Sequence, residues 1–308
     1  MILNEKPFVY TYEDMKEDLQ TFKREYPSFL SLYNYGKTYD GRGLHHVLIG
    51  EKNASRHILI NASVHGREYI TTRLVMHQMQ DFLKKLSRKE TALPDTAIHV
   101  IPMVNPDGVS ISQSGMDGVL SDRTKKTIQN IYHMDKGGNW KEYLRQWKAN
   151  AEGIDINRNF DAQWEAYIDG SDHPSSDCYK GTSAGCTKEA QILIHVTQKY
   201  PVVRTISYHT QGEVIYWYFG QQNELLRESE RFAQKISKAT GYPLDADYKN
   251  LDPAGYKDWA IDKCKIPSLT IETGKGKNPI DSNQFKNILR QNETVWETLI
   301  EDAAVREI

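Results

Sequence analysis

Short apolar runs alternate along the chain with longer segments in which apolar residues recur at helical spacing. Runs of this length, bounded by glycine and polar turns, are typical of buried strands, and the longer periodic segments are typical of helices. Strands that alternate with helices predict a largely parallel sheet covered on both faces. The predicted strands lie in HHVLIG (45–50), HILINAS (57–63), AIHVIPMVN (97–105), RTISYHTQG (204–212) and IPSLTIETG (266–274).

Five segments have a helical pattern. In the first, Thr11 and Asp14 have the spacing of a weak capping box, and the pattern ends at Pro27. A stretch from about residue 107 to 180 fits neither pattern, and loops of such length in a compact domain are usually functional. The other predicted helices lie in 71–90, 187–200, 225–241 and 283–303.

Composition indicates a globular protein and excludes several classes of partner. The chain has 308 residues, 39% of them apolar, and contains no internal repeat or linker of low complexity. We therefore expect a single domain over residues 1–308, with a catalytic core at about 8–302. The net charge of −2, from 39 basic and 41 acidic residues, gives no electrostatic footprint for nucleic acid or for an anionic membrane.

The sequence has no membrane or export signal. No segment reaches the length of about 18 apolar residues that spans a bilayer, and the N-terminus lacks a basic stretch followed by an apolar run. We expect a cytoplasmic location, unless a leader has been removed, and no obligate protein partner. The cysteines Cys178, Cys186 and Cys264 form no CxxC pair and are expected to be reduced thiols, although Cys178 and Cys186 could pair across a short loop.

The first candidate site follows the predicted strand 57–63. His65 and Glu68 have HxxE spacing, so an imidazole nitrogen and a carboxylate can converge on one cation from a single helical turn, with Gly66 keeping that turn tight. The pair alone is weak evidence, because a capped turn with a solvated glutamate has the same sequence pattern.

A third ligand is offered by His209, at the end of another predicted strand. In open α/β sheets, sites form where strands end. Two imidazoles and one carboxylate leave a fourth position for water, the pattern of catalytic zinc, whereas structural zinc sites tend to close all four positions with thiolates. Asp155, in GIDINRNF, is a candidate to accept the free N–H of His65.

A carboxylate, Glu272, ends the predicted strand 266–274. An acidic group at the end of an apolar strand is unfavourable unless it has a partner or a role, and beside activated water it would accept the proton. We therefore assign Glu272 as the general base. The alternative is a glutamate that simply leaves the sheet into solvent.

These residues resemble, in order and spacing across nearly the whole chain, the motifs of the zinc carboxypeptidase family, to which carboxypeptidase A belongs. The motifs are HGRE (65–68), NPDG (105–108), DINRNF (155–160), the histidine of SYHTQG (207–212) and the glutamate of TIETG (270–274). Because carboxypeptidase A is itself a standard example of a His₂Glu zinc enzyme, the ligand set and the resemblance are not independent.

The resemblance implies an α/β fold with an eight-stranded, mixed and mostly parallel sheet between helices. It implies one zinc per chain, held by His65, Glu68 and His209, and hydrolysis of an amide next to a free carboxylate. The asparagine and arginine that clamp this carboxylate in the family fall on Asn157 and Arg158. A planar guanidinium with a neighbouring amide suits that task.

Two family positions are less well defined in this sequence. The cation that polarises the scissile carbonyl aligns with Lys148, which supplies charge without the guanidinium fork, while Arg123 or Arg145 could reach the site by loop folding. The tyrosine that caps substrate aligns with Tyr248, with Tyr256 as the competitor.

The segment HMDKGGNWKEYLRQWKANAEGIDINRNF (133–160) resembles the bacterial branch of the family that cleaves γ-D-glutamyl–diaminopimelate bonds in peptidoglycan stem peptides. Lys257 aligns near the position lining the side-chain pocket, where a cation suits a side chain that ends in a carboxylate; a solvated lysine is the alternative. The expected partner is therefore a peptide or a soluble muropeptide. A metallocarboxypeptidase acting on ordinary peptides, and a zinc-bearing protein that binds peptide C-termini without cleaving them, are the other hypotheses.

Overall fold

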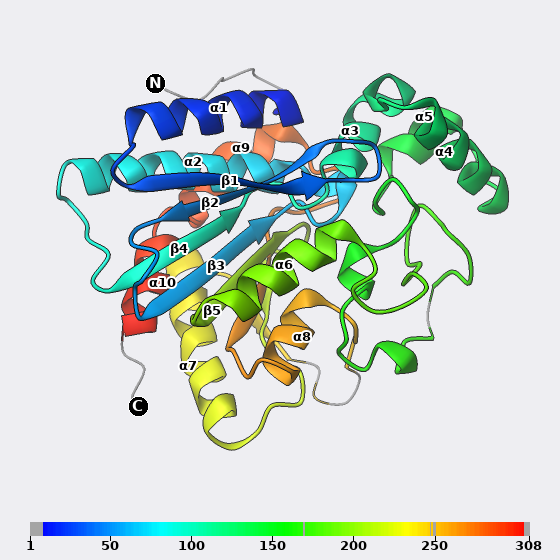
Figure 1. Ribbon diagram of the computed structural model, residues 1–308. Helices are drawn as coiled ribbons and strands as arrows, with labels where there is room; N and C mark the ends of the chain where they lie inside the picture. Colours follow the sequence, from blue (N-terminus) through cyan, green and yellow to red (C-terminus); the bar gives the residue numbers. More distant parts are fainter. Residues whose placement is uncertain (1–8, 169, 247, 249–250, 305–308) are drawn as a thin grey trace.

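An eight-stranded sheet in the order β1-β2-β4-β3-β5-β8-β6-β7 forms the centre of the computed structural model, which describes residues 9–304 apart from 169, 247, 249 and 250 (Figure 1). This confirms the expected mixed sheet of eight strands. The strands are β1 (Leu30–Lys37), β2 (Gly43–Ile49), β3 (Arg56–Ala62), β4 (Thr96–Ile101), β5 (Val202–His209), β6 (Val214–Tyr216), β7 (Leu244–Asp245) and β8 (Ser268–Glu272).

The four central strands β4, β3, β5 and β8 are parallel, and β1 and β2 pair in antiparallel fashion. At the other edge, β6 is antiparallel to β8 and parallel to β7. Alternate residues of a strand point to opposite faces. In β3, Ile58 and Ile60 belong to one hydrophobic cluster and Leu59 to another, so the centre of the sheet is buried on both faces. This explains why its central strands read as continuous apolar runs.

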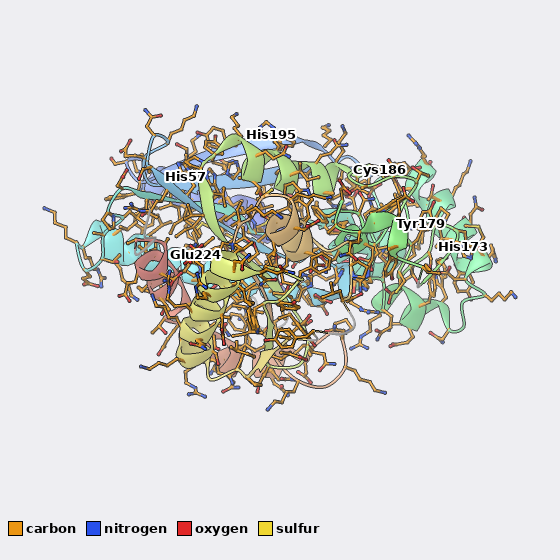
Figure 2. The ribbon with its side chains drawn as sticks, turned by 90° about the horizontal axis from the view of Figure 1, so that it is seen from below. His57, His173, Tyr179, Cys186, His195 and Glu224 are labelled. Carbon is orange, nitrogen blue, oxygen red and sulfur yellow. The ribbon has the colours of Figure 1, made fainter. Side chains whose placement is uncertain are left out.

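Helices cover both faces of the sheet. α1, α2, α7, α9 and α10 share one apolar cluster with the strands, whereas α6 and α8 share the other (Figure 1). Figure 2 shows His195 on α6. In the same view, the loop region that carries His173 and Tyr179 lies at one end of the molecule. The longer helices are α1 (Tyr12–Glu25), α2 (Ile70–Ser87), α3 (Pro106–Ser114), α4 (Asp122–Met134), α5 (Trp140–Arg145), α6 (Lys188–Lys199), α7 (Asn223–Thr240), α8 (Tyr256–Asp262), α9 (Phe285–Gln291) and α10 (Val295–Ala304).

Several sequence expectations are confirmed. The capping box of α1 is present, with Thr11 and Asp14 exchanging hydrogen bonds at 3.2 and 3.0 Å. All three cysteines are free. Among the described residues, none of the helices combines the length and the apolar character needed to cross a bilayer.

Two expectations about helices were wrong. Residues 283–303 form two helices, because α9 ends just before the buried residue Asn292. The side-chain amide of Asn292 donates to the carbonyl of Ile288 at 2.9 Å, and its backbone carbonyl accepts from the side chain of Gln78 at 2.8 Å. The stretch 107–180 is also not loop throughout, since it contains most of α3 and all of α4 and α5. These helices bury few residues, so their apolar periodicity is hard to see in the sequence. α4, for example, buries only Thr124, Ile128 and Ile131.

Glu189, in the first turn of α6, is a fully buried carboxyl whose only partner among the described residues is the amide of Asn150 at 3.4 Å. Burial, with a smaller contribution from Asp107, raises the pKa of Glu189 to about 8. The folded protein therefore keeps this carboxyl protonated at pH values where the unfolded chain, with a normal pKa of 4.5, releases the proton.

Because the folded-state pKa is the higher one, Glu189 favours folding most below pH 4.5 and loses that contribution as pH rises toward about 8. We predict that Glu189→Gln flattens the dependence of stability on pH in this window. Urea unfolding of parent and variant at pH 5 and pH 8 measures it: the parent should lose more free energy of unfolding between the two values. Equal losses in both proteins would contradict the prediction.

Candidate metal centre and active site

Three neighbouring strands end at the same edge of the sheet and carry the predicted chemical groups. β3 and β5 pair in parallel as far as Ala62 and Tyr208, and β5 and β8 pair as far as His209 and Glu272. His65 follows β3 by three residues, at the start of the short 3₁₀ turn η1 (Gly66–Glu68). Residues far apart in sequence are thus placed side by side.

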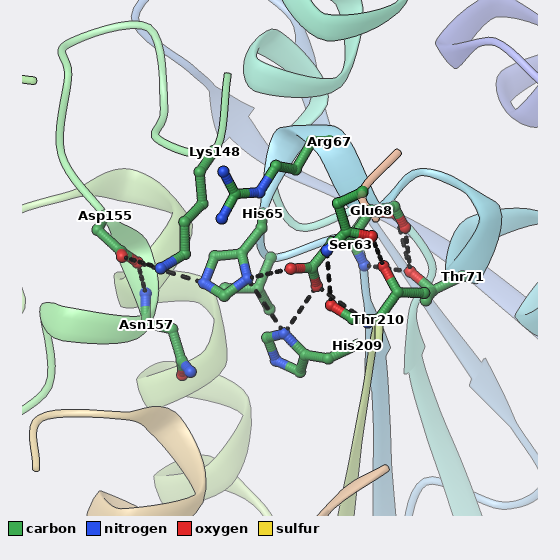
Figure 3. Close-up of polar contacts among 12 residues, drawn as sticks. Ser63, His65, Arg67, Glu68, Thr71, Lys148, Asp155, Asn157, His209 and Thr210 are labelled. Atoms are coloured by element: carbon green, nitrogen blue, oxygen red, sulfur yellow. Dashed lines mark hydrogen bonds and ion pairs between the residues drawn. The ribbon is translucent and has the colours of Figure 1, made fainter. Parts of the chain in front are cut away.

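The side chains of His65, Glu68 and His209 point toward one another (Figure 3). His65 Nδ1 lies 2.8 Å from Glu68 Oε1, His209 Nδ1 lies 3.0 Å from Glu68 Oε2, and the two Nδ1 atoms are 3.3 Å apart. Ligands at about 2.05 Å from a tetrahedral Zn²⁺ are separated by about 3.3 Å. The three donor groups, all buried, therefore fit one zinc ion.

Neighbouring groups hold these ligands in place. The backbone N–H of Thr210 donates to Glu68 Oε2 at 3.2 Å. On the other ring nitrogen, His65 Nε2 lies 3.3 Å from Asp155 Oδ1, which is the partner proposed from the sequence. A carboxylate on the far nitrogen fixes the orientation of a ligating imidazole and raises its basicity.

The turn of HGRE is packed against two other backbones. A Cβ at Gly66 would lie 2.4 Å from the carbonyl oxygen of Gly108, and one at Gly108 would lie 2.4 Å from that of Ala149. The N–H of Gly66 donates to the carbonyl of Lys148 at 2.9 Å, and Asn105 Nδ2 donates to that of Ala149 at 3.0 Å. Gly66 is thus required by close approach as well as by the turn, and NPDG holds the metal-site loop against residues 148–149.

The charges around the histidines support a cation site. Burial lowers the pKa of His65, but the carboxylates of Glu68 and Asp155 outweigh burial and raise it above its usual value. Although burial opposes it, the two histidines hold the pKa of Glu68 below its usual value. The ammonium of Lys148, 2.8 Å from Asp155 Oδ2, likewise outweighs burial and holds the pKa of Asp155 below its usual value. Both carboxylates are therefore ionised, as metal binding requires.

Glu272 is set beside the histidines without a hydrogen-bond partner on Oε2 among the described residues. Burial raises its pKa to about 8, and the charge of Glu68 adds to this, while His209 and Lys148 oppose it. A divalent cation at the three ligands would oppose both causes of the rise. The carboxylate is thus positioned to exchange a proton near neutral pH.

The three candidate metal ligands line a pocket of about 610 Å³. Of the substrate-binding residues predicted from sequence, Asn157, Arg158 and Lys257 line it, and so does Lys148. The guanidinium of Arg158 lies over the ring of Tyr167 at 5.0 Å. The remaining lining is Arg67, Thr210, Gln211, Tyr216, Tyr218, Phe219, Asp245, Ala246, Leu251, Asp252, Gly255, Asp258, Thr270, Glu272 and Asn278.

The structure separates the candidates for the carbonyl-polarising cation. Lys148 Nζ contacts Asp155 at 2.8 Å and Asp177 at 3.0 Å, at the rim of the metal site (Figure 3). Arg123 instead donates to Tyr39, and Arg145 pairs with Glu142, and neither lines the pocket. Among these three cations, Lys148 is the one within reach.

The two tyrosine candidates lie in different surroundings. Tyr256 is fully buried and its hydroxyl is 2.8 Å from that of Thr197, so it is a core residue. Tyr248 is 61% exposed and lies outside the pocket lining, but its ring packs against Tyr218 at 4.5 Å. The capping role of Tyr248 stays a prediction.

Sequence reasoning missed several lining residues. Arg67 lines the pocket and contacts Asp177 at 3.2 Å. Its position within HGRE, between two candidate ligands, could have indicated this. Asn278, in a segment that reads as an ordinary loop, exchanges hydrogen bonds of 2.5 and 2.8 Å with Thr210. No pattern near Asn278 indicates this contact, which depends on tertiary structure.

The family comparison agrees with this site. A profile of the zinc carboxypeptidases matches residues 15–298. Gamma-D-glutamyl-L-diamino acid endopeptidase 1 of Lysinibacillus sphaericus is 30% identical over 294 residues, which cover 92% of this chain and 70% of that protein. The uncharacterized protein YqgT of Bacillus subtilis is 26% identical over 313 residues, which cover 96% of this chain and 78% of that protein.

Solved structures agree on the fold. The carboxypeptidase A of Helicoverpa armigera superimposes with a TM-score of 0.75 at 17% sequence identity, over 97% of this chain and 74% of that one. The mixed eight-stranded sheet between helices is therefore a carboxypeptidase A-like fold.

We predict that Asp155→Asn weakens zinc binding by roughly ten- to hundredfold, because the amide no longer orients His65 or supports its basicity. Titration against a chelator of known affinity measures the zinc dissociation constant. Asp177→Asn is the matched control: Asp177 also contacts Lys148, at 3.0 Å, and its carboxylate makes no described contact with His65. Equal zinc affinities for the two variants would argue against Asp155 as the orienting group.

Proposed function

The chain belongs to the zinc carboxypeptidase family, and we propose that it hydrolyses the amide bond between the γ-carboxyl of D-glutamate and meso-diaminopimelate in peptidoglycan-derived peptides. The observation that carries a hydrolytic role is the convergence of His65, Glu68 and His209 beside Glu272. A protein that only bound peptides would have no use for a carboxylate at this position whose Oε2 is buried and, among the described residues, has no hydrogen-bond partner.

The described side chains have distinct roles in this proposal. Zinc, when bound, lowers the pKa of water and polarises a carbonyl oxygen. Glu272 removes a proton from the attacking water as its oxygen bonds to the scissile carbonyl carbon, and then delivers this proton to the nitrogen as the C–N bond breaks. The ammonium of Lys148, at the rim of the pocket, stabilises the negative charge that develops on the carbonyl oxygen.

The other end of the pocket holds the substrate residue that leaves. Arg158 and Asn157 bind its carboxylate, and the walls near Lys257 receive its side chain. The name of the relative from Lysinibacillus sphaericus, at 30% identity, supports a bond between γ-D-glutamate and a diamino acid. Lys257 donates to the carbonyl of Tyr218 at 3.0 Å and contacts Asp258, so it is fixed at the pocket wall.

Two alternatives use the same residues. A carboxypeptidase acting on ordinary peptides would share the ligands and the base, and a zinc-bearing protein that binds C-termini would share the carboxylate clamp. The deciding experiment incubates the zinc-loaded protein with L-Ala-γ-D-Glu-meso-diaminopimelate and with N-blocked dipeptides, with products identified by mass spectrometry. Cleavage of the dipeptides alone would favour the first alternative, and no cleavage of either would favour the second.

For the base, we predict that Glu272→Gln lowers kcat by about 10²-fold or more, because the amide cannot accept a proton. Zinc content, measured by plasma mass spectrometry, should remain at one ion per chain, which separates loss of the base from loss of the metal. Near-normal turnover by the variant would remove Glu272 from this role.

For the clamp, we predict that Arg158→Ala raises KM for peptides with a free C-terminal carboxylate by roughly ten- to hundredfold, since a charge-assisted hydrogen bond is lost. Arg158→Lys keeps the charge without the fork and should lie between parent and Ala variant. C-terminally amidated peptides serve as the control. If the parent cleaves amidated and free peptides equally well, the clamp does not exist.

A further inference from the structure

A side chain of the protein itself contacts the proposed carboxylate clamp. Asp252 Oδ2 lies 2.7 Å from Nη2 of Arg158, and both residues line the pocket. Arg158 is only 15% exposed, whereas Asp252 is 70% exposed. A substrate carboxylate that takes Arg158 must therefore replace Asp252, which can turn toward solvent or toward another partner.

The segment that carries Asp252 is fixed close to this residue. Ala254 is fully buried, and its backbone exchanges hydrogen bonds with Phe160 at 3.1 Å and with Ala162 at 2.9 Å. The next peptide group is also held, because the N–H of Tyr256 donates to Asn157 Oδ1 at 3.1 Å. Asp252 is thus presented two residues away from an anchored point, beside the same loop that carries the clamp.

The clamp end of the pocket is rich in carboxylates. Its lining includes Asp245, Asp252 and Asp258 with two cations, Arg158 and Lys257. The ammonium of Lys257 is already paired with Asp258. Burial raises the pKa of Tyr216, and the charges of Glu272, Asp245 and Asp252 add to the rise, so this pocket is negatively charged around the phenol.

This charge balance distinguishes between classes of substrate. A substrate that brings only a carboxylate to Arg158 leaves Asp252 without its cationic partner in a pocket that other carboxylates also line, which is unfavourable. A substrate that brings an ammonium group together with its carboxylate offers Asp252 a new partner. The exchange then replaces one ion pair by two of the same kind.

We infer that Asp252 is a specificity residue that selects substrates whose departing residue carries an ammonium group in addition to its carboxylate. The inference rests on the proposed function, because diaminopimelate has this chemistry. Besides the carboxylate next to the scissile amide, which Arg158 binds, it carries an amine and a second carboxylate at its distal centre. Asp252 binds the ammonium when the substrate carboxylate displaces it from Arg158.

The test compares two peptides, L-Ala-γ-D-Glu-meso-diaminopimelate and the same peptide ending in L-2-aminopimelate, which keeps both carboxylates and lacks the distal amine. The parent protein should show a kcat/KM that is roughly 1.5- to fivefold higher for diaminopimelate, the range of one partly exposed ion pair. This preference should shrink at high salt, since the pair is screened. In Asp252→Asn the preference should fall toward one.

Asp161→Asn is the matched control, because Asp161 is 69% exposed and lies outside the pocket lining, and it should keep the parent's preference. An equal preference in the parent and in Asp252→Asn would overturn the inference even if both peptides are cleaved. If the parent cleaves neither peptide, the proposed substrate is wrong. N-blocked dipeptides ending in lysine or norleucine then decide the role of Asp252, which requires a lysine preference that Asp252→Asn loses.

Discussion

The site depends on the register of three parallel strands that end together. Tyr208 and Ile271 are register partners on β5 and β8, and both are fully buried in the same apolar cluster. Because successive side chains alternate between faces, the residues that follow them, His209 and Glu272, both point to the other side. A slip of one residue in either strand would turn an apolar side chain toward the pocket and the polar residue after it toward the core. The packing of the core therefore also sets the positions of the candidate metal ligand His209 and the proposed base Glu272.

Much of this arrangement could be predicted from sequence because it depends on local pattern. The central strands are buried on both faces and appear as apolar runs, and the long helices show clear periodicity. The break at Asn292 could not be predicted in this way, because the backbone carbonyl of Asn292 accepts a hydrogen bond from Gln78, which lies far away in the sequence. The short strands β6 and β7, with three and two residues, carry too few positions to establish a period.

The same distinction applies to the site. Residues that act at strand ends, such as His209 and Glu272, could be found from the pattern, since an acidic or imidazole group there needs a reason. Residues that act by supporting others could not: the requirement for Gly66 comes from the backbone of Gly108, and the position of Asp252 comes from the anchoring of Ala254 to a distant loop. Motif spacing therefore identifies the candidate reacting residues, whereas the residues that hold them in place are found only from tertiary contacts.

The proposed base and the metal are coupled through charge. Three carboxylates lie close together around the candidate metal site, those of Glu68, Asp155 and Glu272. The basic side chains near them are those of His65, His209 and Lys148. Burial and the charge of Glu68 raise the pKa of Glu272 to about 8, so without a further cation it keeps its proton at neutral pH and cannot accept another. A divalent ion held by His65, Glu68 and His209 would lower that pKa and free the carboxylate. In the proposed mechanism, the cation that activates water would thus also bring Glu272 into its basic form.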